Sequence, residues 1–273
     1  MPRRPSPALS DLSVTEFLTL ARIGFFPHGL VIGSSVYDSG YGMYLGTTGE
    51  RATMSNALRE ARRLAVTRMR DQAKAVRAEG VVGVRLLVEH HRWRGNHNVV
   101  KFIAIGTAIG FDPDHVPSEM RGAPSLALYG GMPFTSDLSG QDFVMLLRAG
   151  YRPIELAFGS CVYEIDPKQV GFLNMNNEEL VDYTAAFFDA RETAMKRLSH
   201  DLFREFSAAG HDAPVGVVGM TVTETMHGER GFIRKVPVVE FTAVGTAIAH
   251  LDPRDPRRSP TPPAPQIVVP LDR

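Results

Sequence analysis

The stretch that decides the fold is Gly33-Ser34-Ser35-Val36-Tyr37, because it returns as Gly159-Ser160-Cys161-Val162-Tyr163, 126 residues further along the chain. Two more motifs return in the same order, at offsets of 126 and 139 residues: Asp11-Leu12-Ser13 as Asp137-Leu138-Ser139, and Gly106-Thr107-Ala108-Ile109 as Gly245-Thr246-Ala247-Ile248. An offset that grows while the order is kept is typical of loop insertions into two copies of one folding unit. The sequence therefore predicts a tandem duplication.

Both copies begin with the pattern of a short helix followed by a strand. Ser13-Val14-Thr15-Glu16 has the capping-box spacing that begins a helix, and Gly24 is placed to end it. In the second copy Gly150 is the matching stop. Apolar and β-branched residues then predict strands over residues 30–37 and 156–163.

A long helix and two strands complete each predicted copy. Small and apolar residues recur at three- and four-residue spacing from Ala57 to Val76, and Gly80 ends this helix. Its counterpart begins near Asn177. The closing strands are predicted at 81–89 and 99–109 in the first copy and at 215–225 and 237–248 in the second. This order of elements indicates an α+β fold with helices over one face of a sheet.

The duplication sets the predicted domain boundaries. The first repeat spans residues 11–111 and the second spans residues 137–251, with a linker rich in Pro, Gly and charge at 112–136. Residues 252–273 form a Pro-rich tail that is predicted to be extended from Asp252 to Pro265 and not to pack. Glycines inside the strands, paired as Gly83/Gly216 and Gly106/Gly245, predict a close approach of the helix face that carries Ala57, Ala61 and Ala65.

Composition limits the classes of function. The 30 basic and 30 acidic residues give a formal net charge of zero, which argues against a dedicated nucleic-acid-binding protein. One cysteine allows no disulfide within the chain and no thiolate-rich metal site, and this usage fits a reducing cytoplasm. Neither a secretory signal nor a membrane-spanning run is present. We therefore expect a cytoplasmic protein with no membrane segment.

Several of these motifs resemble the YbjQ-like family, which is described as putative heavy-metal-binding. The resemblance covers roughly residues 27–111 and, more weakly, 153–251, and it is carried by Gly33-Ser34-Ser35-Val36-Tyr37, Glu60-Ala61-Arg62-Arg63-Leu64-Ala65, Gly80-Val81-Val82-Gly83-Val84-Arg85 and Ile105-Gly106-Thr107-Ala108-Ile109. It implies two tandem β-α-β-β units similar in fold to dodecin subunits, each with an extra N-terminal helix. It also implies a ring-like homo-oligomer, typically of five units. Because each chain carries two units, we expect an even-numbered ring or two stacked rings.

Three histidines near a predicted hairpin turn are the candidate metal ligands: His90, His91 and His97. Imidazole suits Zn, Cu or Ni. Successive side chains of a strand point to opposite faces, so His90 and His91 cannot share one ion without a bulge. The second copy has no such cluster. A basic hairpin tip is the alternative interpretation, and we predict no other cofactor.

Two further features have structural interpretations. Cys161 lies in an apolar strand, which predicts a buried, inert thiol. The first long helix is rich in arginine, and we expect its basic face to be solvated, or paired with acidic residues of a neighbour, rather than bound to phosphate.

The end of the tail offers a candidate docking peptide, formed by the apolar residues Ile267, Val268, Val269 and Leu271. These residues either fold back onto the body or bind a protein partner. No nucleophile elbow, phosphate-binding loop, paired CxxC or HExxH pattern is present. The sequence therefore predicts a non-catalytic oligomeric binding or scaffold protein. The alternatives are heavy-metal binding at the histidine hairpin and an enzyme of unrecognised type.

Overall fold

The computed structural model describes residues 8–41, 48–93, 97–116, 118–166, 179–209, 213–230 and 235–259. The elements within these ranges are α1 (Val14–Ala21), β1 (Phe25–Tyr41), β2 (Gly49–Glu50), α2 (Ala52–Ala75), β3 (Gly80–Trp93), β4 (His97–Phe111), β5 (Phe134–Thr135), α3 (Gly140–Arg148), β6 (Tyr151–Glu164), α4 (Val181–Ala209), β7 (Gly216–Arg230) and β8 (Lys235–His250). Short 3-10 turns occupy Pro113–His115, Ser118–Met120 and Tyr129–Gly131. The predicted α+β class is confirmed.

Two mainly antiparallel sheets form the frame of the molecule, and in each the first strand of the unit pairs with its last strand, so that β1-β4-β3 matches β6-β8-β7. The first sheet has the order β1-β4-β3-β5 and the second has the order β2-β6-β8-β7. The recurring strand motif occupies matching register positions, since Ser35 lies opposite Phe102 and Cys161 lies opposite Phe241. Each predicted strand is present and longer than expected.

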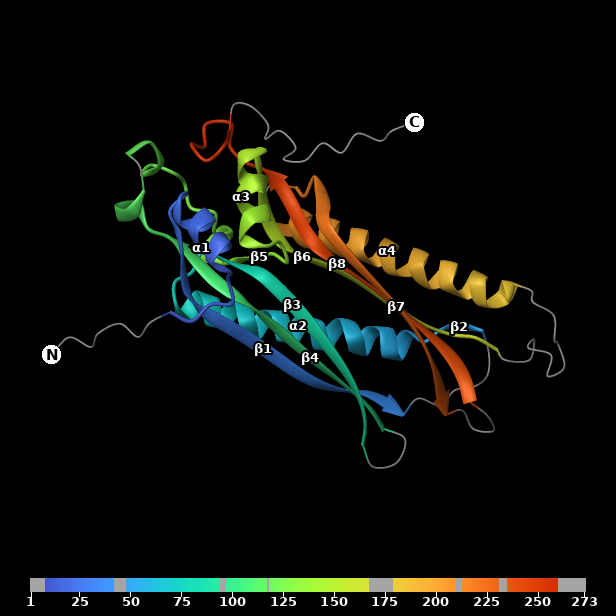
Figure 1. The fold of residues 1–273 in the computed structure, drawn as a ribbon. Helices are drawn as coiled ribbons and strands as arrows, with labels where there is room; N and C mark the ends of the chain where they lie inside the picture. Colours follow the sequence, from blue (N-terminus) through green and yellow to red (C-terminus); the bar gives the residue numbers. More distant parts are fainter. Residues whose placement is uncertain are drawn as a thin grey trace, which may run out of the picture.

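The sheets and long helices stack in four layers: first sheet, α2, second sheet and α4 (Figure 1). One hydrophobic cluster joins Phe102 of the first sheet, Val66 of α2 and Phe158 of the second sheet. A second cluster packs the small residues of α4 on the other face of the second sheet, around Cys161 and Phe241. The helix α2 is therefore shared by both sheets, whereas the described residues of α4 pack on the second sheet.

Glycine lets each long helix approach its own sheet closely, but not at the predicted positions. A Cβ on Gly33 would overlap the backbone of Ala65 in α2, and one on Gly159 would overlap the backbone of Ala194 in α4. The prediction for Gly83 was wrong, because Gly83 has a φ of 63° and lies at a β-bulge of β3. Its counterpart is Gly219, with a φ of 67° at the bulge of β7, rather than Gly216.

The prediction for the other glycine pair was also wrong. Gly106 and Gly245 make room for neighbouring strand residues: Val81, Val82 and Val84 at Gly106, and Val217, Val218 and Met220 at Gly245. These glycines therefore serve packing within each sheet, and the close approach of the helices depends on the strand motif itself.

The repeated Asp-Leu-Ser and Gly-Thr-Ala motifs meet in space. The Thr107 hydroxyl donates to the Asp11 carboxylate over 2.5 Å and accepts from the Asp11 backbone N–H over 3.2 Å. Thr246 makes the same two contacts with Asp137, whose backbone N–H lies 3.0 Å from the threonine oxygen. This joint fixes the start of each short helix against the last strand of its sheet.

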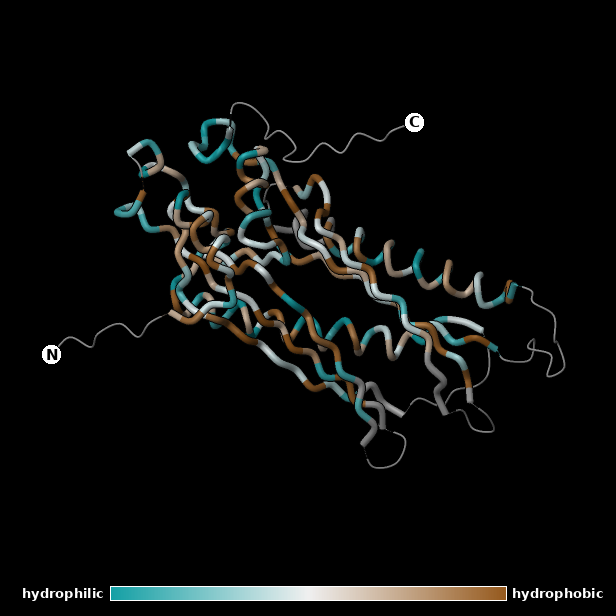
Figure 2. The backbone as a smooth tube through the Cα atoms, viewed as in Figure 1, coloured by the Kyte–Doolittle hydropathy of each residue, from teal (hydrophilic) through white to brown (hydrophobic). Residues whose placement is uncertain are grey.

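The two short helices pack together at one end of the molecule. Ser13 and Glu16 form the predicted capping box of α1, and Glu16 also accepts from the Gly140 backbone N–H at the start of α3. Gly24 and Gly150 end these helices with φ of 84° and 88°. Figure 2 shows hydrophobic residues concentrated at this end, where a third cluster gathers around Phe25, Phe134 and Phe143.

Two short strands cross between the sheets. The strand β2 follows β1 in sequence but pairs with β6 of the second sheet. The strand β5 precedes the second unit but pairs in parallel with β3 of the first sheet. Each unit therefore completes the sheet edge of the other, and residues 134–135 of the predicted linker are part of the first sheet.

Candidate functional site

A cleft of about 650 Å³ lies between the two sheets, where β3 faces β7 and β8 beside α2. The strand β3 provides an apolar wall and the second sheet provides a hydroxyl-rich wall. Its lining residues include Val84, Leu86, Val88, Thr221, Thr223, Thr225, Thr242 and Glu240.

The walls of the cleft follow from strand alternation. Val84, Leu86 and Val88 point from β3 toward α2 and belong to or border the shared core. Thr221 and Thr223 face them from β7, on the surface opposite to α4. A cleft with an apolar wall and a wall of neutral hydrogen-bonding groups suits an amphipathic ligand or an extended peptide.

Asp137 and Arg85 lie at the rim of the cleft and already have partners within the chain. Burial raises the pKa of Asp137, although the hydrogen bond from Thr246 favours its ionised form. Arg85 pairs with Asp11 over 2.5 Å. Both residues therefore serve the joints between the repeated motifs.

The predicted histidine site lies on the β3–β4 hairpin. His91 is exposed, and its Nε2 lies 3.1 Å from the Glu89 carboxylate, which also binds Lys101. The side chains of His90 and His97 lie outside the described residues. Among the side chains that the structure does describe, no group of three or more His, Cys, Asp or Glu residues is placed to hold a metal ion. Metal binding at His90, His91 and His97 stays a prediction.

Cys161 is buried in the core beneath α4, as predicted. Burial, reinforced by the nearby Glu50 carboxylate, raises the pKa of its thiol to about 12. Because the thiolate is the reactive form, this cysteine is inert in the folded chain.

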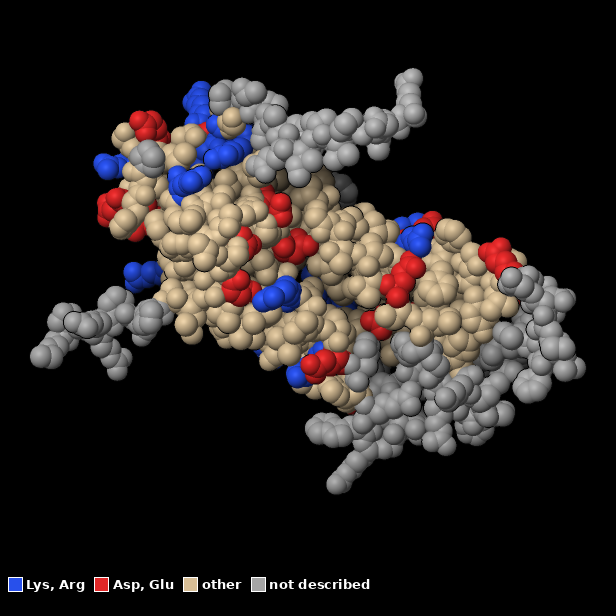
Figure 3. Space-filling model, in the orientation of Figure 1, with Lys and Arg blue, Asp and Glu red and all other residues tan. Residues whose placement is uncertain are grey.

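The arginine-rich face of α2 is paired within the chain, as expected for a structural role. Arg70 forms an ion pair with Glu155 of the second sheet, and the guanidinium of Arg62 lies 4.8 Å above the Phe158 ring. Arg68 donates to the Ser34 carbonyl. On the visible face, acidic and basic side chains are interspersed among uncharged residues (Figure 3). These arginines therefore join α2 to both sheets.

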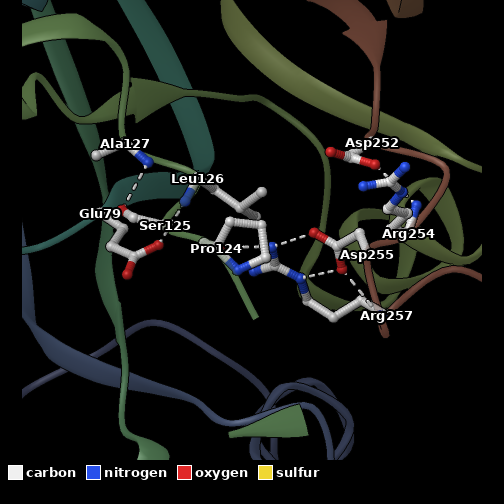
Figure 4. Close-up of polar contacts among 9 residues, drawn as sticks. All are labelled: Glu79, Pro124, Ser125, Leu126, Ala127, Asp252, Arg254, Asp255 and Arg257. Carbon is white, nitrogen blue, oxygen red and sulfur yellow. Dashed lines mark hydrogen bonds and ion pairs between the residues drawn. The ribbon is translucent and has the colours of Figure 1, made fainter. Parts of the chain in front are cut away.

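The first part of the C-terminal segment packs against the body, which corrects the prediction that residues from Asp252 onward do not pack. Asp255 and Arg257 are buried and form an ion pair over 2.5 Å, and Arg257 also donates to the Pro124 carbonyl (Figure 4). Its guanidinium lies 5.9 Å from the Phe25 ring. A buried pair with a backbone partner outweighs the local preference of the prolines for extended chain.

The predicted docking residues Ile267, Val268, Val269 and Leu271 lie outside the described residues. In the part of the chain that the structure describes, no helix is long and apolar enough to cross a membrane.

Sequence reasoning missed the cleft. Its one sequence signal is the alternation of Thr221, Thr223 and Thr225, which marks a strand with a hydroxyl-bearing face. The apolar wall comes from the other unit, and nothing in the sequence pairs β3 with β7 across a gap.

Two comparisons with known proteins show the family to which the chain belongs. Residues 28–112 match the model of a family described as putative heavy-metal-binding (YbjQ). The encapsulin nanocompartment protein Rv1762c of Mycobacterium tuberculosis is 36% identical over 245 residues, which cover 88% of this chain and 84% of that protein. The first match agrees with the resemblance seen in the sequence, and the second extends across both sheets. The chain therefore belongs to the family of this mycobacterial encapsulin nanocompartment protein, and its first unit is a YbjQ-type domain.

Proposed function

We propose that this chain is a non-catalytic, oligomeric binding or scaffold protein of a cytoplasmic protein nanocompartment. The supporting observation is the likeness to an encapsulin nanocompartment protein across 88% of the chain, which includes both sheets. The paired arginines and the inert Cys161 assign the charged and nucleophilic groups to structure rather than to chemistry. The inter-sheet cleft is the surface that we assign to a ligand or peptide.

We further propose that the apolar residues at the end of the tail attach the chain to its partner. The test is sedimentation of the tagged full chain, from cells that make it, through a density gradient. We expect the chain in a fast-sedimenting particle fraction, and we expect its loss from that fraction when residues 266–273 are deleted. A full chain found only in slow fractions would contradict the proposal.

A matched variant separates tail length from tail chemistry. It keeps all 273 residues but replaces Ile267, Val268, Val269 and Leu271 with serine. This variant should sediment like the deletion. If it stays with the particle, the apolar residues are not the attachment.

A second candidate function is metal binding at the hairpin, favoured by the family description and by the exposed imidazole of His91 next to Glu89. Isothermal titration of the purified chain with Zn²⁺ or Cu²⁺ tests it, with elemental mass spectrometry of the untreated protein. Alanine at His91 and His97 should abolish a stoichiometric site. Unchanged stoichiometry would remove this candidate.

A further inference from the structure

Inside the chain, α2 covers the face of the second sheet that lies away from α4. The Val162 backbone N–H donates to the Ser55 hydroxyl over 3.0 Å, and the Val162 carbonyl accepts from the Arg51 N–H over 2.7 Å. Phe158 and Val162 on this face are 5% and 0% exposed. The first unit thus covers this face of the second sheet with the beginning and the outer surface of α2.

The equivalent face of the first sheet is open. Ile32 and Val36 occupy the positions of Phe158 and Val162, 126 residues earlier, and are 42% and 63% exposed. Leu87 of β3, on the same face, is 51% exposed. Ile32 and Val36 are therefore uncovered, next to the Lys101–Glu89 ion pair on the same face, whereas their counterparts Phe158 and Val162 are buried.

The helix that would provide the cover is α4, whose outer surface is also open. The contacts of Ala65 with Gly33 and of Ala194 with Gly159 align α2 with α4 at an offset of 129 residues. By this alignment Leu180 and Phe188 take the places of Arg51 and Arg59, and they are 50% and 59% exposed. Arginines of α2 pair with glutamates of the second sheet, as Arg70 does with Glu155. In place of Arg51 and Arg59, α4 carries apolar side chains. These suit the apolar Ile32 and Val36 of the first sheet.

The start of α4 reproduces the polar groups of the start of α2. Ser55 donates its backbone N–H to the Arg51 carbonyl, and Thr184 does the same to the Leu180 carbonyl, over 2.9 and 3.0 Å. Thr184 therefore places a hydroxyl where Ser55 has one. This hydroxyl donates to the Glu179 carboxylate over 2.8 Å, and its oxygen can still accept a hydrogen bond from the Val36 backbone N–H at the edge of β1.

We propose that a second copy of this chain docks the outer surface of its α4 on the open face of the first sheet, in the way that α2 covers the second sheet. The contact uses two different surfaces, so each chain offers one of each, and association is head-to-tail. Such a contact closes into rings or extends into filaments, according to the rotation between copies. The inference rests on the oligomeric part of the proposed function and specifies its interface.

The crossing strands support the same docking independently. The strand β5, which lies just before the second unit, pairs with Gly80–Val81 of the first unit. The matching segment of the first unit is Ala8–Leu9, and its matching site is Gly216–Val217 at the start of β7. Leu9 is 72% exposed, and Val222 of β7 is 50% exposed. When a second copy docks, the Ala8–Leu9 segment of one chain would lie against Gly216–Val217 of the other.

The experiment uses two full-length variants, Val36→Glu and Phe188→Glu, with mass measured by light scattering. The wild-type chain should form oligomers, and each variant alone should fall to the 30.0 kDa of one chain. Tyr129→Glu, at an 81% exposed aromatic residue outside both surfaces, should keep the wild-type mass. Circular dichroism checks that each variant is folded.

Mixing the two variants gives the decisive result. Val36→Glu chains keep an intact α4 surface and Phe188→Glu chains keep an intact sheet surface, so a mixture should form dimers and nothing larger. Failure to form dimers overturns the inference, as does a monomeric wild-type chain. An oligomer whose mass neither variant changes overturns this interface and leaves the proposed function standing.

Discussion

Gly33 and Gly159 show how one missing carbon sets the distance between a helix and a sheet. A methyl group at Gly33 overlaps the backbone of Ala65 and Met69, and backbone cannot move aside as a flexible side chain can. Gly33→Ala should therefore lower the free energy of unfolding by about 1–3 kcal/mol. Urea unfolding followed by circular dichroism measures it.

The control is Gly122→Ala, because a Cβ at Gly122 has open space around it. We expect this variant to stay within about 0.5 kcal/mol of the wild type. Equal effects of the two substitutions would show that α2 does not pack on the strand motif as described.

Asp137 should give the stability a measurable pH dependence. Its raised pKa means that the folded chain holds the proton more tightly than the unfolded chain does. The protonated Asp137 therefore adds to the free energy of unfolding. This contribution is complete below the ordinary aspartate pKa and is lost as pH rises through the raised pKa. Relative to the wild type, Asp137→Asn should therefore gain stability as pH rises through this window.

Urea unfolding of both proteins at steps between about pH 4 and pH 7 checks this prediction. Because other groups titrate in both proteins, only the difference between the two curves is interpreted. A difference that does not change with pH would contradict the assignment, as would one that favours the wild type at higher pH.

At the scale of elements, the segment after β8 depends on one buried ion pair. The side chains of Asp255 and Arg257 are both 0% exposed. Asp255→Ala leaves a buried guanidinium without its carboxylate and should cost about 3–5 kcal/mol. The double variant Asp255→Ala/Arg257→Met should recover most of this, because no unpaired charge remains.

Thermal unfolding of the two variants, with the exposed Asp252→Ala as control, provides the comparison. If the single variant is no less stable than the double variant, the pair does not hold the segment on the body.

The elements that were predicted correctly are those whose signals are local. Ser13 and Glu16 indicate a capping box within four residues and so predict the start of α1. The alanines of α2 recur at helical spacing and so predict that helix. The bulge at Gly83 could not be distinguished from close packing, since glycine serves both. The strands β2 and β5 are too short to carry a period. The burial of Arg257 depends on Pro124 and Phe25, which are distant in sequence.

The candidate site could not be predicted because it also depends on residues that are distant in sequence. The cleft exists because β3 of one unit faces β7 of the other beside α2. Comparing the copies reveals equivalent strands, but it does not show which faces meet. The histidine cluster was visible because its members are neighbours in sequence, and that closeness says little about a shared ligand.

At the scale of the whole molecule, the two units are not separable bodies. The core around α2 includes Val31 and Phe102 from the first sheet and Phe158 and Val238 from the second. The strands β2 and β5 complete each other's sheets. One interface between the two units thus lies inside the chain, whereas Ile32 and Val36 of the first sheet and Phe188 of α4 are exposed.

We therefore expect the chain to unfold in one cooperative step. The single tryptophan, Trp93, belongs to the first unit, whereas far-ultraviolet circular dichroism reports on both. At one fixed protein concentration, the urea transitions of the two signals should coincide. Phe158→Ala, made in the second unit, should move both midpoints down together, because it removes about 3–5 kcal/mol from the shared core. Separate transitions, or a shift confined to circular dichroism, would mean that the two units fold independently.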